Sequence, residues 1–397
     1  MGEWKNVRVG ELGKIITGKT PKTSISDNYG GRIPFLTPSD NMSVKYVGKT
    51  SKTLTEKGLL EVKNAILPEN SVCVSCIGSD LGKAVITTCP TVTNQQINSI
   101  IVDEKSFDVS FVYYAMQILG KKMNFISKTS TVPIVNKSSF SSYEIKCPPR
   151  EDQKRIAAVL SALDSKIECN KKINDNLEQQ AVALFKSWFV DFSLFGGTVP
   201  ENWEDTTLEN ITTLITRGIA PKYSDNSDQT VVNQKCIRNH TIDLSLARTH
   251  TPKAINEKWL KFGDLLINST GDGTLGRVAQ VWFAPKALTV DSHVTIVRPA
   301  REELIFYIGL WGILHEKEIE SLHTGSTGQT ELPRDRVKKL KLLLPDNISL
   351  SRFNSIIAPM ASTIISNQEE NQKLASLRDT LLPKLMSGEI DVSSIQL

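Results

Sequence analysis

The sequence predicts an α+β fold, in which two similar mixed α/β domains are separated by two long antiparallel helices. The helices would form a coiled-coil spacer, and the chain would carry an internal pseudo-two-fold repeat. Three observations support this prediction. The chain repeats itself once, with Trp4 opening the first copy and Trp203 the second; each copy has a mixed α/β pattern followed by a long helical pattern; and a constant offset of 197 residues aligns the two helical stretches. We therefore expect two related modules on two matching helices.

The repeat predicts six segments along the 397 residues. They are a first domain at 1–149, a first spacer helix at 150–192, a linker at 193–202, a second domain at 203–345, a second spacer helix at 346–387 and a C-terminal tail at 388–397.

The first module mixes short β-rich runs with turn residues. Residues 72–77 are predicted to form a strand and residues 107–119 a helix. Cys73 and Cys76 stand three positions apart on that strand and therefore face opposite sides, a poor geometry for a shared zinc ion. With no second cysteine pair in the chain, we expect buried thiols.

The first long helix is predicted from Arg150 to about Phe189, a stretch with neither glycine nor proline. Its apolar spacing alternates four and three residues, which is the heptad spacing of a coiled coil, and two asparagines interrupt it. The predicted contact positions are Ile156, Leu160, Leu163, Ile167, Asn170, Asn174, Leu177, Ala181, Leu184 and Trp188.

The second module repeats the mixed pattern. Strands are predicted at 265–267, 278–283 and 294–297, and helix at 302–320. The run Gly271-Asp272-Gly273-Thr274-Leu275-Gly276 matches a dinucleotide-binding motif, but that motif requires a helix directly after it. Since a strand follows here, a tight turn is predicted, and the basic residue after Gly276 is available for a phosphate.

The second long helix carries asparagines at the same two layers, Asn367 and Asn371. If the helices pack antiparallel, Asn170 meets Asn371 and Asn174 meets Asn367, which would fix their register. Forty residues of helix span roughly 60 Å, enough to hold two modules over more than one turn of duplex. A dimerisation coiled coil is the alternative, but each helix already has a partner within its own chain.

Charge and missing motifs favour a binding protein over an enzyme. Net charge is +4, and residues 1–149 carry 18 Lys and Arg against 12 Asp and Glu, an excess of +6. Residues 203–345 carry 18 against 17, an excess of only +1. The chain has no phosphate-binding G-x-x-x-x-G-K-[ST], no H-E-x-x-H and no G-x-S-x-G, and we expect no metal site. His315 and Glu316 are expected to be solvated.

No apolar run reaches membrane-spanning length, and the first five residues do not begin a signal peptide, so a cytoplasmic protein is expected.

Candidate nucleic-acid contacts are polar or basic residues at matching places in the two modules. Asn94, Gln95 and Gln96 carry side chains that can form paired hydrogen bonds with adenine, and Asp291-Ser292-His293 stands in their place in the second module. An ordinary polar loop is the alternative for each cluster. The predicted DNA-binding residues of the first module are Lys19, Lys22, Lys45, Tyr46, Ser79, Lys83, Asn94, Gln95, Gln96, Lys128, Thr129 and Ser130. Those of the second are Arg217, Lys222, Tyr223, Lys235, Arg238, Arg277, His293, Ser326, Thr327 and Gln329.

Over essentially its whole length the chain resembles the specificity subunit of Type I restriction–modification systems. The motifs that carry the resemblance are Gly18-Lys19-Thr20-Pro21, Gly30-Gly31-Arg32-Ile33-Pro34-Phe35, Pro148-Pro149-Arg150-Glu151-Asp152-Gln153, Leu184-Phe185-Lys186-Ser187-Trp188-Phe189 and Ser387-Gly388-Glu389-Ile390. The second half departs from the pattern at residues 291–293 and 346–349.

The resemblance implies a non-catalytic subunit in a prokaryotic cytoplasm. Its two target-recognition domains would each read one half of a bipartite site on double-stranded DNA, with a gap set by the helices. Two methylation subunits would dock on it for adenine methylation, and two restriction subunits would add ATP-dependent cleavage. S-adenosylmethionine, ATP and Mg²⁺ would bind to those partners, with no cofactor on this chain. The alternatives are the recognition part of another methyltransferase or nuclease system, and a coiled-coil scaffold that binds no DNA.

Overall fold

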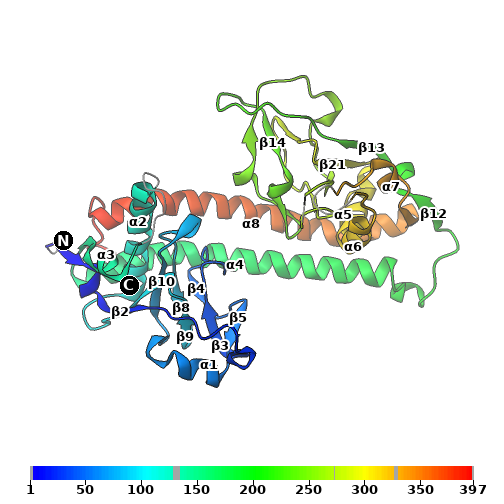
Figure 1. The fold of residues 1–397 in the computed structure, drawn as a ribbon. Coiled ribbons are helices and arrows are strands. Elements are labelled where there is room, and N and C mark those ends of the chain that lie inside the picture. The colour runs from blue at the N-terminus through cyan, green and yellow to red at the C-terminus, as the bar shows by residue number, and fades with distance from the viewer. Residues whose placement is uncertain (1–2, 128–134, 272, 326–329, 396–397) are drawn as a thin grey trace. The chain divides into compact units, whose positions relative to one another are not determined.

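The computed structural model describes residues 3–127, 135–271, 273–325 and 330–395. Two compact units divide the chain: unit 1 comprises residues 1–169 and 370–397, and unit 2 comprises residues 170–369. Each unit therefore contains one mixed α/β region together with part of both long helices (Figure 1). The predicted α+β class and the duplicated layout are confirmed.

Unit 1 is built on a five-stranded sheet of order β2-β10-β7-β8-β4 and a four-stranded sheet of order β5-β3-β9-β6, with β1 paired to β11. Its strands are β1 Lys5–Arg8, β2 Gly13–Thr17, β3 Tyr29–Leu36, β4 Tyr46–Val47, β5 Lys52–Leu54, β6 Ile66–Leu67, β7 Ser71–Ser75, β8 Ala84–Thr87, β9 Thr91–Thr93, β10 Ile97–Val102 and β11 Glu144–Cys147. Its shorter helices are α1 Glu56–Glu61, α2 Val109–Ser127 and α3 Lys137–Ser142.

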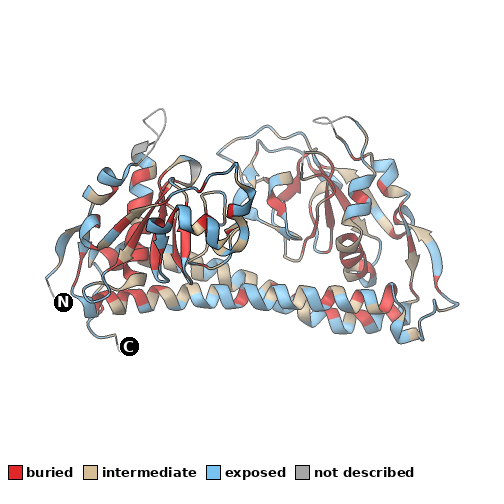
Figure 2. Ribbon diagram, turned by 60° about the horizontal axis from the view of Figure 1, so that its bottom comes forward, coloured by how far each residue is buried: buried red, intermediate tan, exposed pale blue. Residues whose placement is uncertain are grey.

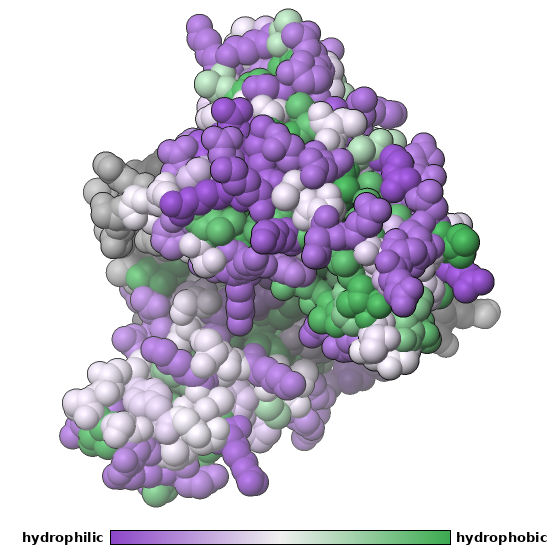
Figure 3. Space-filling view, turned by 90° about the vertical axis from the view of Figure 1, so that its right-hand side faces the viewer, coloured by the Kyte–Doolittle hydropathy of each residue, from purple (hydrophilic) through white to green (hydrophobic). Residues whose placement is uncertain are grey.

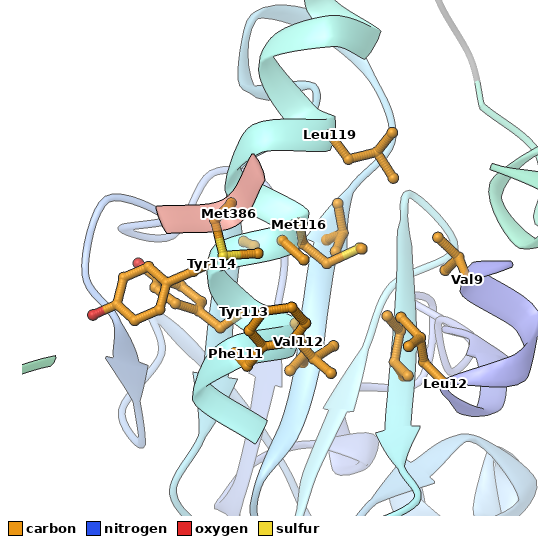
Figure 4. Packing of buried hydrophobic residues seen from close by; sticks show 14 of the residues in the cluster. Val9, Leu12, Phe111, Val112, Tyr113, Tyr114, Met116, Leu119 and Met386 are labelled. Atoms are coloured by element: carbon orange, nitrogen blue, oxygen red, sulfur yellow. The ribbon is translucent and has the colours of Figure 1, made fainter. Parts of the chain in front are cut away.

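The core of unit 1 lies between the five-stranded sheet and α2. Strand β7 is buried on both faces, and α2 contributes Phe111, Val112, Tyr114 and Met116 to the same cluster. Met386, near the end of the second long helix, joins them (Figure 4). Cys73 is fully buried, and burial raises the pKa of its thiol to about 12, so the prediction of buried thiols in this strand is confirmed.

Unit 2 repeats the central sheet with one strand fewer, in the order β13-β21-β18-β19. A three-stranded sheet, β17-β14-β20, and the pairs β12-β22 and β15-β16 complete it. Its strands are β12 Glu204–Thr207, β13 Thr212–Arg217, β14 Thr230–Val232, β15 Ile237–Arg238, β16 Thr241–Ile242, β17 Arg248–Thr249, β18 Leu265–Asn268, β19 Val278–Gln280, β20 Leu288–Val290, β21 Val294–Pro299 and β22 Lys341–Leu344. Its shorter helices are α5 Ile305–Leu314, α6 Glu316–Ser321 and α7 Arg334–Lys338.

The single helix predicted at 302–320 is divided at His315. The ring of His315 stacks on Trp311, with 4.8 Å between ring centroids, and its Nδ1 lies 2.8 Å from the Trp311 carbonyl oxygen. The backbone N–H of His315 still donates to the Trp311 carbonyl at 3.0 Å, and α6 starts at Glu316. The expectation that His315 and Glu316 are solvated is wrong, because both side chains are partly buried and engaged in contacts.

The two long helices are α4 Arg150–Phe189 and α8 Asn347–Ser387. All of the predicted heptad positions of α4 are buried or half-buried, as a coiled-coil contact stripe requires. Pro149 precedes α4, where its fixed φ suits a helix start, and Glu151 and Asp152 place negative charge in the first turn. Most of the buried residues of both helices lie in the outer turns, where each helix packs on a domain (Figure 2), whereas Asn170 is buried in the middle of α4.

Within each unit the two helices run antiparallel. In unit 1, Asp164 pairs with Arg378 at 2.8 Å and Lys166 pairs with Glu370 at 3.2 Å. In unit 2, the Nδ2 of Asn367 donates a 2.8 Å hydrogen bond to the Oδ1 of Asn174. The predicted antiparallel direction and the Asn174–Asn367 layer are thus confirmed, whereas the Asn170–Asn371 layer stays a prediction.

Candidate nucleic-acid interface

One edge of the five-stranded sheet in unit 1 brings together four strand ends that lie apart in the sequence. Antiparallel pairing sets the end of β2 beside the start of β10, through Thr17 and Asn98, and the end of β7 beside it on the other side. The start of β8 pairs with the end of β7. The segments that leave these strands, which we call the unit 1 edge, are residues 18–20, 76–83 and 94–96.

Three amides on the unit 1 edge are held in a turn. The backbone N–H of Gln96 donates to Asn94 Oδ1 at 3.1 Å, and Asn94 Nδ2 donates to Gln96 Oε1 at 3.1 Å. Thr20 Oγ1 donates to Gln95 Oε1 at 2.6 Å, while the Gln95 side chain stays exposed. Since a carbonyl oxygen has two lone pairs, this bond orients Gln95 and leaves its amide able both to donate and to accept.

A polar groove of about 610 Å³ adjoins these amides. Asn94 and Gln96 line it, and Tyr29 and Phe35 contribute aromatic surface. The hydroxyl side chains along it belong to Thr20, Thr23, Thr37, Ser39, Ser51 and Thr53. Hydroxyls and amides both donate and accept hydrogen bonds, which suits contact with the edges of bases and with phosphate oxygens.

In unit 2, the corresponding strand ends of the four-stranded sheet lie together in the same way. They are the end of β13, the start of β21, the end of β18 and the start of β19. We call the segments that leave these strands, residues 218–219, 269–277 and 291–293, the unit 2 edge. His293 repeats the turn of Gln96, because its backbone N–H donates to Asp291 Oδ1 at 2.9 Å.

The backbone hydrogen bonds of the two edges correspond one to one. Cys76 N–H donates to the Gln96 carbonyl and Ser269 N–H to the His293 carbonyl, both at 2.8 Å. Likewise, the N–H of Gly18 reaches the carbonyl of Ile97, and the N–H of Gly218 reaches that of Val294, both at 3.1 Å. The side chains differ between the edges, while the backbone that presents them is shared.

Each edge also contains a tight turn followed by a basic residue. Gly82 and Gly276 both have φ of +84°, and their N–H groups donate at 2.8 Å to Ser75 and Asn268. Because β19 rather than a helix follows Gly276, the prediction of a tight turn instead of a dinucleotide-binding loop is confirmed. The next residues are Lys83, which forms a salt bridge with Asp80 at 2.5 Å, and Arg277.

Several predicted contact residues lie at or beside the edges. Lys19 is exposed directly after Gly18, and its N–H donates to the Thr93 carbonyl at 2.8 Å. His293 is exposed, with Nδ1 2.7 Å from the Thr270 hydroxyl. Lys235 is exposed next to Gln234, whose Oε1 accepts from the same hydroxyl at 3.1 Å.

Other predicted residues lie elsewhere or have protein partners. Lys45 is turned inward: its Nζ donates to Ser161 Oγ of α4 at 2.6 Å, and burial lowers the pKa of its amine to about 8. Tyr46 beside it is half exposed. Arg217, at the end of β13, forms a 2.5 Å salt bridge with Glu331 and donates to the Leu332 carbonyl.

The loop after β13 brings Lys222 and Tyr223 to the surface, where Tyr223 forms a β-bridge with His250. The guanidinium of Arg248 stacks 3.6 Å from the centre of the Tyr223 ring, and no sequence pattern predicted this contact. Thr20 was also missed as the partner of Gln95, since it stands 75 residues before it.

A second groove, of about 850 Å³, lies in unit 2 between α4 and the domain. Arg238 and Arg277 line it together with Lys186 of α4. Six predicted residues, Lys128, Thr129, Ser130, Ser326, Thr327 and Gln329, lie outside the described residues, as does the side chain of Ser79.

The described residues contain no cluster of three or more His, Cys, Asp or Glu that could hold a metal ion. Across the same residues, no helix is both long and apolar enough to span a bilayer. Hydrophilic residues cover most of the face shown in Figure 3, with smaller hydrophobic patches between them. The chain thus presents two polar edges that share one backbone arrangement.

Comparison with known proteins identifies the class. Residues 1–179 match the family model described as the Type I restriction modification DNA specificity domain. The chain is 28% identical to the Type I restriction enzyme MjaIX specificity subunit of Methanocaldococcus jannaschii, over 99% of this chain and 95% of that protein. It is 32% identical to the HindI specificity subunit of Haemophilus influenzae, over 43% of this chain and 39% of that protein.

The fold has a solved counterpart in the crystal structure of the Type I restriction–modification S subunit from M. genitalium. The TM-score is 0.56 at 17% identity, with 97% of this chain and 96% of that chain covered. These comparisons confirm the resemblance drawn from the sequence. Over nearly its whole length, the chain is similar to specificity subunits of Type I restriction–modification systems.

Proposed function

We propose that the chain selects the DNA site of a Type I restriction–modification enzyme, with each edge reading one half of a bipartite sequence. The duplicated edge carries the proposal: one backbone arrangement presents Asn94–Gln96 in unit 1 and Asp291–His293 in unit 2. Because the side chains differ while the backbone is shared, the two half-sites should differ in sequence.

Gln95 is the residue best placed to read a base on the unit 1 edge. An amide that both donates and accepts can form the paired hydrogen bonds that distinguish adenine in the major groove. Lys19 and Lys83, on the same edge, supply positive charge for the backbone phosphates.

The catalytic steps belong to partners. Two methylation subunits would bind along α4 and α8, whose middle turns carry many exposed residues, and would transfer a methyl group from S-adenosylmethionine to adenine. Two restriction subunits would use ATP and Mg²⁺ for cleavage. This chain supplies base recognition and the fixed gap between half-sites, and it works in the cytoplasm beside the chromosome.

A binding measurement tests the proposal at the residue level. The complex of this chain with its methylation subunits is titrated with duplexes that carry its site, at several salt concentrations. Gln95→Ala should weaken binding about 10-fold or more and relax selectivity at one base pair, as expected for the loss of a paired contact. Lys19→Ala should weaken binding to all duplexes alike and reduce the salt slope by about one.

Lys45→Met serves as the matched control, because the Lys45 amine is directed into the protein. Its DNA affinity should equal that of the wild type. If the wild-type complex binds no duplex at any salt concentration, the DNA proposal fails and a protein scaffold becomes the better account.

A further inference from the structure

A two-residue turn in unit 2 carries a histidine where the backbone favours glycine. Strands β15 and β16 pair through Ile237–Ile242 and Arg238–Thr241, which leaves Asn239 and His240 as the connection. Both have positive φ, 49° and 58°. Hairpin turns with positive φ at both central residues favour Asn-Gly, so Asn239 fits the turn and His240 is strained in it.

The strained histidine is clamped between two carboxylates. Its Nδ1 lies 2.8 Å from Glu178 Oε1 on α4, and its Nε2 lies 3.0 Å from Glu316 Oε2 on α6. All three side chains are about 30% exposed, at 31%, 27% and 28%. Carboxylates only accept hydrogen bonds, and both ring nitrogens donate only in the imidazolium form, so the clamp holds a positive charge.

The hydrogen bonds from Glu178 and Glu316 raise the pKa of His240 to about 9, against the opposing effect of burial. The other charged groups lining the same groove are Asp175 and Lys186 of α4, Arg238 of the hairpin and Arg277 of the unit 2 edge. From α8 the neutral side chains of Ile364 and Gln368 approach His240.

The clamp formed by His240, Glu178 and Glu316 lies a short distance along the chain from the unit 2 edge. The backbone of His240 forms a bridge with Ala279 of β19, and Arg277 of the unit 2 edge stands two residues before Ala279. A displacement of the hairpin turn from α4 would therefore move the strand that begins at this edge.

We propose that His240 is a positioning residue, whose charged ring fastens the β15–β16 turn to α4 and α6 and thereby fixes the unit 2 edge on the spacer helix. The proposal rests on the proposed function, in which that edge reads one half-site. A residue with positive φ persists only where the surrounding structure holds it, and here two partners distant in sequence hold His240.

Thermal unfolding of the full chain between pH 6 and pH 10 tests the clamp without DNA. The folded-state pKa of His240 is raised, so its stabilisation is complete below about pH 6.5 and is lost as the pH rises through about 9. His240→Gln should lower the midpoint by about 3–8 °C at pH 6.5, and the difference should close near pH 10.

Asn239→Gly is the matched control, since it relaxes the same turn and leaves the clamp intact. Its midpoint should equal or slightly exceed that of the wild type. Adding Glu178→Gln to His240→Gln should recover part of the lost stability, because two carboxylates no longer face each other. A deficit of His240→Gln that is the same at every pH, or an equal loss in Asn239→Gly, would overturn the proposal.

DNA binding distinguishes a positioning role from a purely structural one, because a purely structural role would not change selectivity at one half-site alone. In the complex with methylation subunits at pH 7.5, His240→Gln should lose about 10-fold in affinity, and base changes in the unit 2 half-site should matter less than in the wild type. Selectivity at the unit 1 half-site should be unchanged. If the wild-type complex binds its site and His240→Gln binds identically, the positioning role is refuted. If the wild-type complex binds no duplex, the proposed function fails, and the unfolding profile alone shows whether His240 stabilises the fold through the two carboxylates.

Discussion

At the scale of single residues, the backbone turn at Gly82 leaves no room for a side chain. Gly82 has φ of +84°, and a Cβ built on it would lie 2.3 Å from the Cα of Gly120 in α2. Gly30 has the same φ, but a Cβ there would meet nothing within 4 Å. A comparison of Gly82 with Gly30 therefore separates the cost of a strained backbone from the cost of a steric clash.

Gly82→Ala is therefore predicted to lower the free energy of unfolding by about 3 kcal/mol, the sum of strain and a backbone clash. Gly30→Ala should lower it by only about 1 kcal/mol, from strain alone. Chemical denaturation of both variants measures the difference. Equal losses would mean that α2 does not pack against the turn in solution.

Candidate residues and turns could be identified from the sequence where the pattern is local. Asn94–Gln96 and the turns at Gly82 and Gly276 could be identified from short runs of residues. Lys45 could not be placed, because its partners Tyr114 and Ser161 are 69 and 116 residues away. His240 was missed for the same reason, since Glu178 and Glu316 stand 62 and 76 residues from it.

Among the elements, we expect the asparagine layer between the long helices to specify their register at some expense in stability. Asn367 donates to Asn174, and Asn174 Nδ2 donates to the Ile364 carbonyl at 3.4 Å. A half-buried polar pair of this kind is expected to favour one alignment over its neighbours, because a shift would separate the two amides.

Asn174→Leu alone should lower the free energy of unfolding by about 1–3 kcal/mol, because the Asn367 amide loses its acceptor. The double variant Asn174→Leu/Asn367→Leu should regain most or all of that loss, since an apolar layer replaces the unmatched amide. Denaturation midpoints of the single and double variants form the test. A double variant less stable than the single one would contradict the role given to this layer.

The elements also show where sequence patterns suffice. A heptad spacing sustained over forty residues determined both ends of α4, and Pro148-Pro149 marked where it starts. The two-residue strands β4, β6, β15 and β16 could not be predicted, because two residues display no alternation and pairing with distant strands decides them. The break at His315, between α5 and α6, is not indicated by the periodicity of the sequence.

At the scale of the whole molecule, we expect each domain to recognise one half-site independently of the other domain. The matching backbone hydrogen bonds of the two edges support this expectation, because the same backbone arrangement presents different side chains in each unit. Exchange of one domain should then leave the other half-site and the gap intact, since α4 and α8 are unchanged.

The most direct measurement maps methylated adenines in a genome carrying this system, before and after residues 203–345 are replaced by the equivalent domain of another Type I specificity subunit. The account predicts a split motif with a fixed gap, in which one half changes and the other half and the gap length stay the same. A change in both halves, or a motif with no gap, would contradict it.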